Sequence, residues 1–242
     1  MTATASYSVG PGPDEPYDID AQLVSAPDQR VTAAIADAVT RWSATIVRGV
    51  PDAVVHQAPR SCTDDMPGFD GSVDDIVVLV VVIPDVTGFM ADAAPCDIGP
   101  DGLPRLSIIR LDADWIDWLA THDNQLGDLV THEMGHALGF GGSRWWAYRQ
   151  ELGENDFVFT GPRAVAEWSH LGGSGTVPLS DHGDHWDERI MQNEVMSCAV
   201  EYVPTHPLSA VTVAAMADIG YHVDLGASEP WSLPAEPGFM TC

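Results

Sequence analysis

Residues 131–142 read THEMGHALGFGG and contain two histidines and a glutamate in the pattern HExxH. His132 and His136 are four residues apart, so on a helix their rings project from one face, one turn apart. Two imidazoles placed in this way can bind one Zn²⁺ at about 2.0–2.1 Å. Gly139 is placed to end the helix in a left-handed conformation. The stretch therefore predicts a zinc-binding helix from about residue 124 to residue 138.

Glu133 follows the first motif histidine and is the predicted general base. It is too near His132 to be an easy ligand, but it leans toward the open side of the metal and can hold a metal-bound water. Zinc lowers the pKa of such a water to about 7, so a carboxylate can take its proton at neutral pH. The motif therefore predicts hydrolysis by a zinc-bound water that Glu133 activates.

A zinc site of this kind needs a third protein ligand. The most compact form of the motif would have a histidine at position 142, where this chain has Gly142. A loop rich in glycine and aspartate offers His182 and His185 instead. A carboxylate is the alternative, because Glu154 or Glu167 would complete a site of two histidines and one glutamate. Spacing alone does not choose between them.

Composition excludes several classes of partner. The 242 residues carry 36 acidic and 10 basic side chains, and the formal net charge is −26. Such a charge repels nucleic acids and anionic membranes, so we expect neither as a partner. The longest apolar run, IVVLVVVI at 76–83, is too short to span a bilayer and is rich in β-branched residues. It predicts a buried strand and no membrane insertion. Nothing in the sequence determines an oligomeric state.

The four cysteines form no CxxC pair, which argues against a cysteine zinc site. Their even number favours two disulfides in an oxidising compartment. We expect Cys62 to pair with Cys96, because these residues lie on either side of the strand at 76–83, and Cys198 to pair with Cys242. Four reduced, buried thiols are the alternative.

Periodicity and turn residues predict an α+β protein in three parts. A flexible, Pro/Gly-rich leader spans 1–16, an N-terminal catalytic lobe with a mixed sheet, helices and the motif helix spans 17–139, and an irregular C-terminal lobe spans 140–242. Strands are expected at 17–24, 76–83 and 105–112, helices at 29–47, 162–171 and 207–220, and loops at 49–75 and 90–104. Asp28 is the expected N-cap of the first helix.

Residues 17 to about 225 resemble the leishmanolysin family of metzincin zinc metallopeptidases. In that family an insertion separates HExxHxxG from a third histidine in an HW.E segment, and NE.M follows. This chain has HEMGHALGF at the motif, HWDE at 185–188 and NEVM at 193–196. Further similar segments are AVTRWSATIV (38–47), DDIVVLVVV (74–82), FTGPRAVAEW (159–168) and SAVTVAAMADIGY (209–221).

The resemblance implies a role for each matching residue. His132, His136 and His185 would be the zinc ligands and Glu133 the general base. Met196 would form the methionine turn beneath the metal. The implied protein is a secreted, two-lobed metzincin-like endopeptidase that takes proteins or peptides as substrates.

Two other functions compete with this interpretation. One is a catalytically silent, zinc-stabilised module that binds a polymer or a protein, and the intact Glu133 argues against it. The other is zinc-dependent hydrolysis of a compound that is not a peptide. The recognition surface of the binding module would come from the abundant tryptophans, among them Trp145, Trp146, Trp168, Trp186 and Trp231. The alternative is that these tryptophans fill the core of the smaller lobe and the rim of the cleft.

Overall fold

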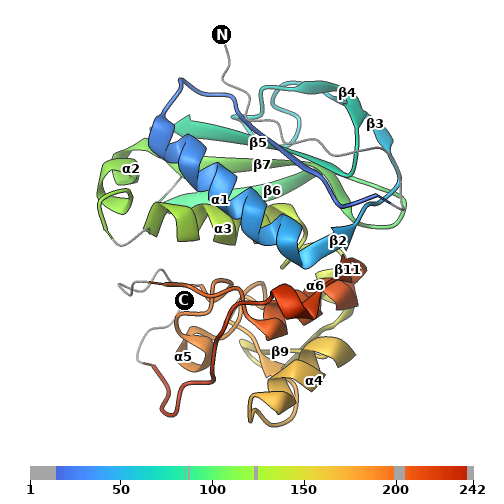
Figure 1. Cartoon of the computed structure of the whole chain (residues 1–242), viewed down its shortest axis with the longest axis vertical. Helices are drawn as coiled ribbons and strands as arrows, with labels where there is room; N and C mark the ends of the chain where they lie inside the picture. Colours follow the sequence, from blue (N-terminus) through green and yellow to red (C-terminus); the bar gives the residue numbers. More distant parts are fainter. Residues whose placement is uncertain (1–14, 85, 87, 123–124, 199–204, 239–242) are drawn as a thin grey trace. The chain divides into compact units, whose positions relative to one another are not determined.

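The computed structural model describes residues 15–84, 86, 88–122, 125–198 and 205–238 (Figure 1). The chain divides into two compact units, Met1–Leu138 (unit 1) and Gly139–Cys242 (unit 2), and each is described by itself. All but the last two residues of the expected leader at 1–16 lie outside the described residues. Among the described helices, none has the length and apolar character needed to cross a membrane.

A four-stranded sheet forms the centre of unit 1, with the strand order β1-β5-β7-β6. The first three strands are parallel, and β6 runs antiparallel at one edge. The strands predicted near the start of the chain, at 76–83 and at 105–112 are confirmed. The bounds are β1 (Ile19–Leu23), β5 (Ile76–Ile83), β6 (Ala91–Ile98) and β7 (Pro104–Asp112).

Strand β5 is apolar along its whole length because both of its faces are covered. Val77, Leu79 and Val81 belong to a core cluster that also contains Val55 and Val73. Successive side chains of a strand alternate between the two faces of a sheet, so the residues between these three point to the opposite face. That face is covered by two long helices, α1 (Gln29–Thr45) and α3 (Gln125–Ala137), which lie side by side (Figure 1).

The two long helices of unit 1, α1 and α3, begin and end within a few residues of the predicted bounds. Asp28 caps α1, since its side chain accepts a hydrogen bond of 2.8 Å from the backbone N–H of Arg30. Gly139 has a φ of 103°, which confirms the left-handed stop after α3. The last two residues of the expected first helix, Ile46 and Val47, belong instead to the short strand β2 (Ile46–Arg48). A short helix, α2 (Ala113–Leu119), follows β7.

Two expected loops of unit 1 are wrong in part or in full. The connection at 49–75 contains a hairpin of β3 (Ala53–Gln57) and β4 (Phe69–Val73). The expected loop at 90–104 contains β6, whose residues ADAAPCDI have little intrinsic preference for a strand. Pairing with β7 holds this segment extended. Pro95 is tolerated there because β6 lies at the edge of the sheet.

The expected disulfide between Cys62 and Cys96 is confirmed, with a Cα–Cα distance of 5.3 Å. It ties β6 to the loop between β3 and β4. Cys198 is also disulfide-bonded. Its expected partner, Cys242, lies outside the described residues.

Unit 2 contains a small antiparallel sheet that the sequence did not predict, with the strand order β10-β9-β8. The helices expected at 162–171 and 207–220 are present as α4 and α6, which pack against each other. The strands are β8 (Arg149–Gly153), β9 (Asp156–Phe159), β10 (Val177–Pro178) and β11 (His222–Val223), and the helices are α4 (Pro162–His170), α5 (Glu188–Met191) and α6 (Ala210–Ile219).

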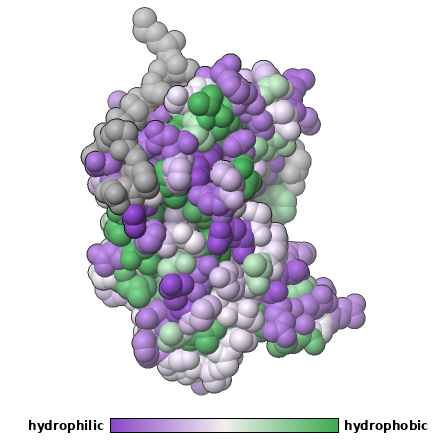
Figure 2. Space-filling view, turned by 90° about the vertical axis from the view of Figure 1, so that its right-hand side faces the viewer, coloured by the Kyte–Doolittle hydropathy of each residue, from purple (hydrophilic) through white to green (hydrophobic). Residues whose placement is uncertain are grey.

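Aromatic side chains fill the interior of unit 2. Trp145 stacks on Phe159 with a ring separation of 4.1 Å, and Trp186 lies edge-on to both Phe140 and Phe159. Trp168 is buried as well, whereas Trp146 is 45% exposed. With three of the five expected tryptophans buried, the recognition surface of a binding module is not formed as that hypothesis requires. On the face in Figure 2, hydrophilic residues are widespread and hydrophobic ones form separate patches.

Candidate metal centre

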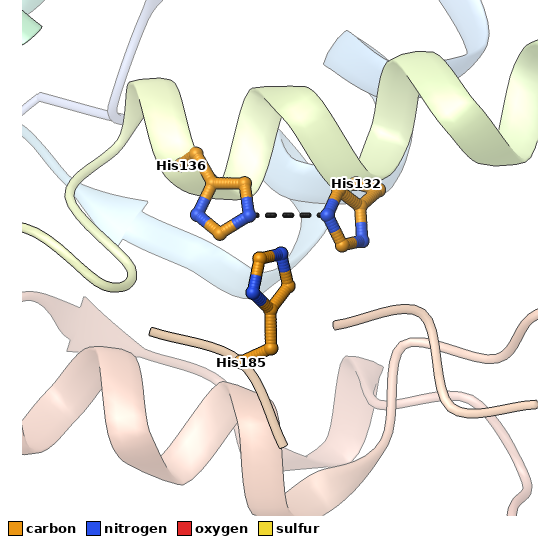
Figure 3. Close-up of side chains that lie close together, drawn as sticks. All are labelled: His132, His136 and His185. Carbon is orange, nitrogen blue, oxygen red and sulfur yellow. Dashed lines mark hydrogen bonds between the residues drawn. The ribbon is translucent and has the colours of Figure 1, made fainter. Parts of the chain in front are cut away.

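The two motif histidines lie on one face of α3, one turn apart (Figure 3). Their Nε2 atoms are 3.0 Å from each other, and both side chains are half-buried. Two nitrogens bound tetrahedrally to one zinc ion at about 2.05 Å would be about 3.3 Å apart. His132 and His136 are therefore arranged closely enough to share one metal ion.

Helix α3 is fixed at both ends of the motif by side chains from unit 1. The indole N–H of Trp42, on α1, donates a 2.8 Å hydrogen bond to the carbonyl of Thr131, the residue before His132. The hydroxyl of Ser107, on β7, donates a 2.7 Å bond to the carbonyl of Ala137. The carbonyls of a helix's last turn have no partner within the helix, so Ser107 satisfies one of them. These contacts hold the backbone on either side of the histidines.

Glu133 is 5% exposed. Burial, together with the smaller effect of the nearby negative charge of Asp92 on β6, raises the pKa of this carboxyl to about 8. A cation bound by the adjacent histidines would oppose both effects, since an opposite charge favours the ionised carboxylate. A poorly solvated carboxyl thus follows His132 directly in the motif helix, and such a group can exchange a proton with a reacting group.

His185 belongs to unit 2 and lies in the segment between β10 and α5 (Figure 3). Its Nδ1 is 2.9 Å from Oδ1 of Asp184. The backbone N–H of Ser180 donates a 3.0 Å bond to the His185 carbonyl. A carboxylate that accepts a hydrogen bond from Nδ1–H fixes the tautomer in which Nε2 carries the lone pair. Such a carboxylate is the usual partner of the second ring nitrogen in a histidine that binds a metal. His182, in the same loop, is exposed.

Met196 is buried in unit 2 and is joined to the segment of His185 by backbone hydrogen bonding. The N–H of Trp186 donates a 3.1 Å bond to the Met196 carbonyl, and Trp186 forms a parallel bridge with Ser197. The methionine backbone therefore lies beside the residue that follows His185.

The carboxylate alternatives for the third ligand have different surroundings. Glu154 is exposed in the turn between β8 and β9. Glu167, on α4, lies 3.3 Å from Nδ1 of His170. In the described parts of the chain, neither belongs to a group of three side chains that could hold one metal ion.

Comparisons with known proteins agree with the motif. The profile of the leishmanolysin family matches residues 56–152, which include His132, Glu133 and His136. Leishmanolysin from Leishmania chagasi is 30% identical over 187 residues, covering 69% of this chain and 30% of that protein. Leishmanolysin from Leishmania major gives the same identity and coverage. A human protein, ciliated left-right organizer metallopeptidase, is 26% identical over 180 residues, covering 62% of this chain and 23% of that protein.

The chain belongs to the leishmanolysin family. It spans about a third of the length of the curated leishmanolysins that it matches. The family profile ends before His185 and Met196, so it supports the motif helix and leaves the roles of those two residues as predictions.

Residues that support this leishmanolysin site were not found from the sequence. Asp92 lies in β6, which was expected to be a loop, and its position near Glu133 depends on that strand. Asp184 is adjacent to a candidate ligand, and an acidic residue beside a histidine was the available signal. Glu194 is the second residue of the NEVM segment, and no local pattern indicates its buried hydrogen bonds.

Proposed function

We propose that this protein is a zinc-dependent endopeptidase. In this proposal His132, His136 and His185 bind Zn²⁺, Glu133 is the general base, and Met196 forms the methionine turn. The observation that carries the proposal is the 3.0 Å separation of the two Nε2 atoms on the helix that the leishmanolysin profile matches.

The donor set fits zinc. Each of the three histidines offers one ring nitrogen, and imidazole is a common zinc ligand. The contact between Asp184 and Nδ1 of His185 gives the third histidine the partner that orients ligating imidazoles. Three protein ligands with a fourth position for water or substrate are typical of catalytic zinc sites.

Bound zinc would supply Lewis-acid polarisation of a substrate carbonyl and would lower the pKa of water to about 7. Glu133 would accept a proton from the attacking water and then deliver it to the nitrogen of the leaving amine. Its low exposure keeps bulk water away from the proton that it carries. His132 and His136 would not take part in proton transfer, since their ring nitrogens hold the metal.

Proteins or peptides are the proposed substrates, as the names of the matched peptidases suggest. Secretion is the proposed localisation. It is supported by the disulfide between Cys62 and Cys96, because such bonds persist mainly in oxidising compartments.

The first test compares cleavage of fluorescently labelled unfolded casein by the wild type and by Glu133→Gln. The variant should retain zinc, and its turnover should fall by about 10²–10⁴-fold, the usual contribution of a general base. Glu167→Gln is the matched control and should cleave as the wild type does. Full activity of Glu133→Gln, or no cleavage by zinc-loaded wild type, would contradict the proposal.

The second test concerns the third ligand. His185→Ala should lose most of its zinc affinity in a chelator competition, because two histidines alone bind zinc weakly. His182→Ala, in the same loop, should bind zinc as the wild type does. If His185→Ala keeps full affinity and Glu167→Ala loses it, the carboxylate alternative is right.

A further inference from the structure

A buried carboxylate in unit 2 has no role in the proposed chemistry. Glu194 is 1% exposed, and four donors converge on it. Its Oε1 accepts hydrogen bonds from the Ser209 backbone N–H (3.1 Å), the Ser209 hydroxyl (2.7 Å) and the Thr212 hydroxyl (2.5 Å). Its Oε2 accepts a 2.6 Å bond from the backbone N–H of Met196. Burial raises the pKa of this carboxyl, and the four donors oppose that rise because each of them favours the ionised form.

These bonds close a ring that includes the neighbour of His185. The indole N–H of Trp186 donates a 2.7 Å bond to the Thr212 hydroxyl, which in turn donates to Glu194. Glu194 binds the Met196 N–H, and the Met196 carbonyl accepts from the Trp186 N–H at 3.1 Å. Trp186 is therefore held by both its indole and its backbone. Since His185 directly precedes Trp186, this ring fixes the backbone that carries the candidate ligand.

Unit 2 contains a second buried carboxylate, Asp218, whose described hydrogen bonds do not connect to the segment of His185. Asp218 accepts hydrogen bonds from the backbone N–H groups of Arg163 (3.1 Å) and Ala164 (2.9 Å), at the start of α4. Like Glu194 it joins α6 to another segment and is buried. None of its described hydrogen bonds reaches Trp186 or Met196. Asp218 is therefore the matched control for Glu194, because it is a buried carboxylate of the same unit that is not connected to His185.

We propose that Glu194, acting through Thr212 and Trp186, is a positioning residue that holds His185 in the orientation needed to bind the metal. This inference rests on the proposed function, in which His185 is the third ligand. Outer residues that orient metal ligands typically contribute 10–100-fold to metal affinity, so the effect should be measurable without any substrate.

The deciding variants are Glu194→Gln and Thr212→Val. In Glu194→Gln one of the two oxygens becomes an NH₂ group, which must face either the Met196 N–H or the donors at Ser209 and Thr212. Thr212→Val keeps the carboxylate and the side-chain shape but removes the hydroxyl that links it to Trp186. Thr212→Ser keeps the hydroxyl and should restore the link.

The measurements are zinc affinity by chelator competition and the visible spectrum of the cobalt-loaded protein, which reports the geometry at the metal. Glu194→Gln and Thr212→Val should bind zinc about 10–100-fold more weakly and change the cobalt spectrum. Thr212→Ser should bind within about threefold of the wild type. Asp218→Asn should lower the thermal midpoint and leave both metal measurements unchanged.

The outcomes separate this inference from the proposed function. Wild-type affinity in Thr212→Val overturns the inference, as does equal weakening by Asp218→Asn, which would indicate a general loss of structure. If Glu194→Gln does not fold, the comparison of Thr212→Val with Thr212→Ser decides. Loss of zinc in His185→Ala together with unchanged binding in Glu194→Gln and Thr212→Val contradicts the inference alone. Retention of zinc in His185→Ala contradicts the proposed function.

Discussion

The two motif histidines lie on a regular helix of unit 1, whereas His185 lies in a unit 2 segment that has little regular structure. Helix α3 is held by packing against α1 and the sheet and by an ion pair of 2.8 Å between Asp128 and Arg41 of α1. Trp42 also binds the carbonyl of Thr131 in the middle of the helix, and Ser107 binds that of Ala137 at its end. The segment of His185 is held by a backbone hydrogen bond from Trp186 to Met196 and by a ring of buried polar side chains. A helix fixes ligands through its repeat, but an irregular segment needs specific polar partners at each turn.

Among the changes that test this comparison, we expect the loss of the disulfide in unit 1 to have the largest effect on the free energy of unfolding. Cys62 and Cys96 are 34 residues apart, and a bond across a loop of that length stabilises by about 3–4 kcal/mol. Replacing both with serine should lower the free energy of unfolding of unit 1 by this amount. Hydrogen exchange would be followed by mass spectrometry, and β7 should lose protection while α6 keeps it. Equal loss in α6 would mean that the two units do not unfold separately.

Unit 1 also contains a buried carboxylate, Asp75. We expect it to make the free energy of unfolding depend on pH, with an effect of intermediate size. Asp75 accepts hydrogen bonds from the backbone N–H groups of Asp18 and Val50. Burial nevertheless raises its pKa to about 6, from a usual 3.8. Between about pH 4 and pH 6 the folded state therefore holds a proton that the unfolded state has released. The contribution of this group to stability is fully present below about pH 4 and is lost as the pH rises through 6.

The test compares unfolding free energies of the wild type and Asp75→Asn in urea from pH 4 to pH 8. Asparagine resembles the protonated acid, so the variant lacks this titration. The stability of the wild type relative to the variant should fall by about 2 kcal/mol over that range. A difference that stays constant or rises with pH would contradict the assignment.

The smallest effect is expected from Ser107→Ala, which removes the hydrogen bond to the carbonyl of Ala137 at the end of α3. An unsatisfied buried carbonyl costs about 1–2 kcal/mol in unfolding free energy. Ser61→Ala is the matched control, because the Ser61 hydroxyl binds the Ala58 carbonyl at an exposed position. A cost as small as that of the control would mean that packing alone fixes the end of the motif helix.

The sequence predicted those parts of the fold that have a period and an end signal. Helix α1 shows apolar residues at helical spacing after the Asp28 cap, and α3 ends at Gly139. Strand β5 was evident because both of its faces are buried, and the disulfide between Cys62 and Cys96 was expected from its position around that strand.

What the sequence missed depends on distant partners. Strand β6 has alanine, aspartate and proline where strands usually have β-branched residues, and it is extended only because β7 lies beside it. The bonds of Glu194 join NEVM to α6, and no local pattern predicts which buried hydroxyl a carboxylate will meet. For the site, the spacing of His132 and His136 was informative, while the roles of His185 and Met196 came from a family resemblance and stay predictions.

The position of β6 at the edge of the sheet also affects how the protein behaves in concentrated solution. No described strand pairs with its outer side, and an open strand edge is a template on which a second copy can add its own edge. Pro95 has no N–H to donate, and the register is irregular on both sides of Asp97. Asp97 adds a negative charge on the same strand, which repels an identical edge. The sequence that made β6 hard to recognise therefore also protects the protein from edge-to-edge aggregation.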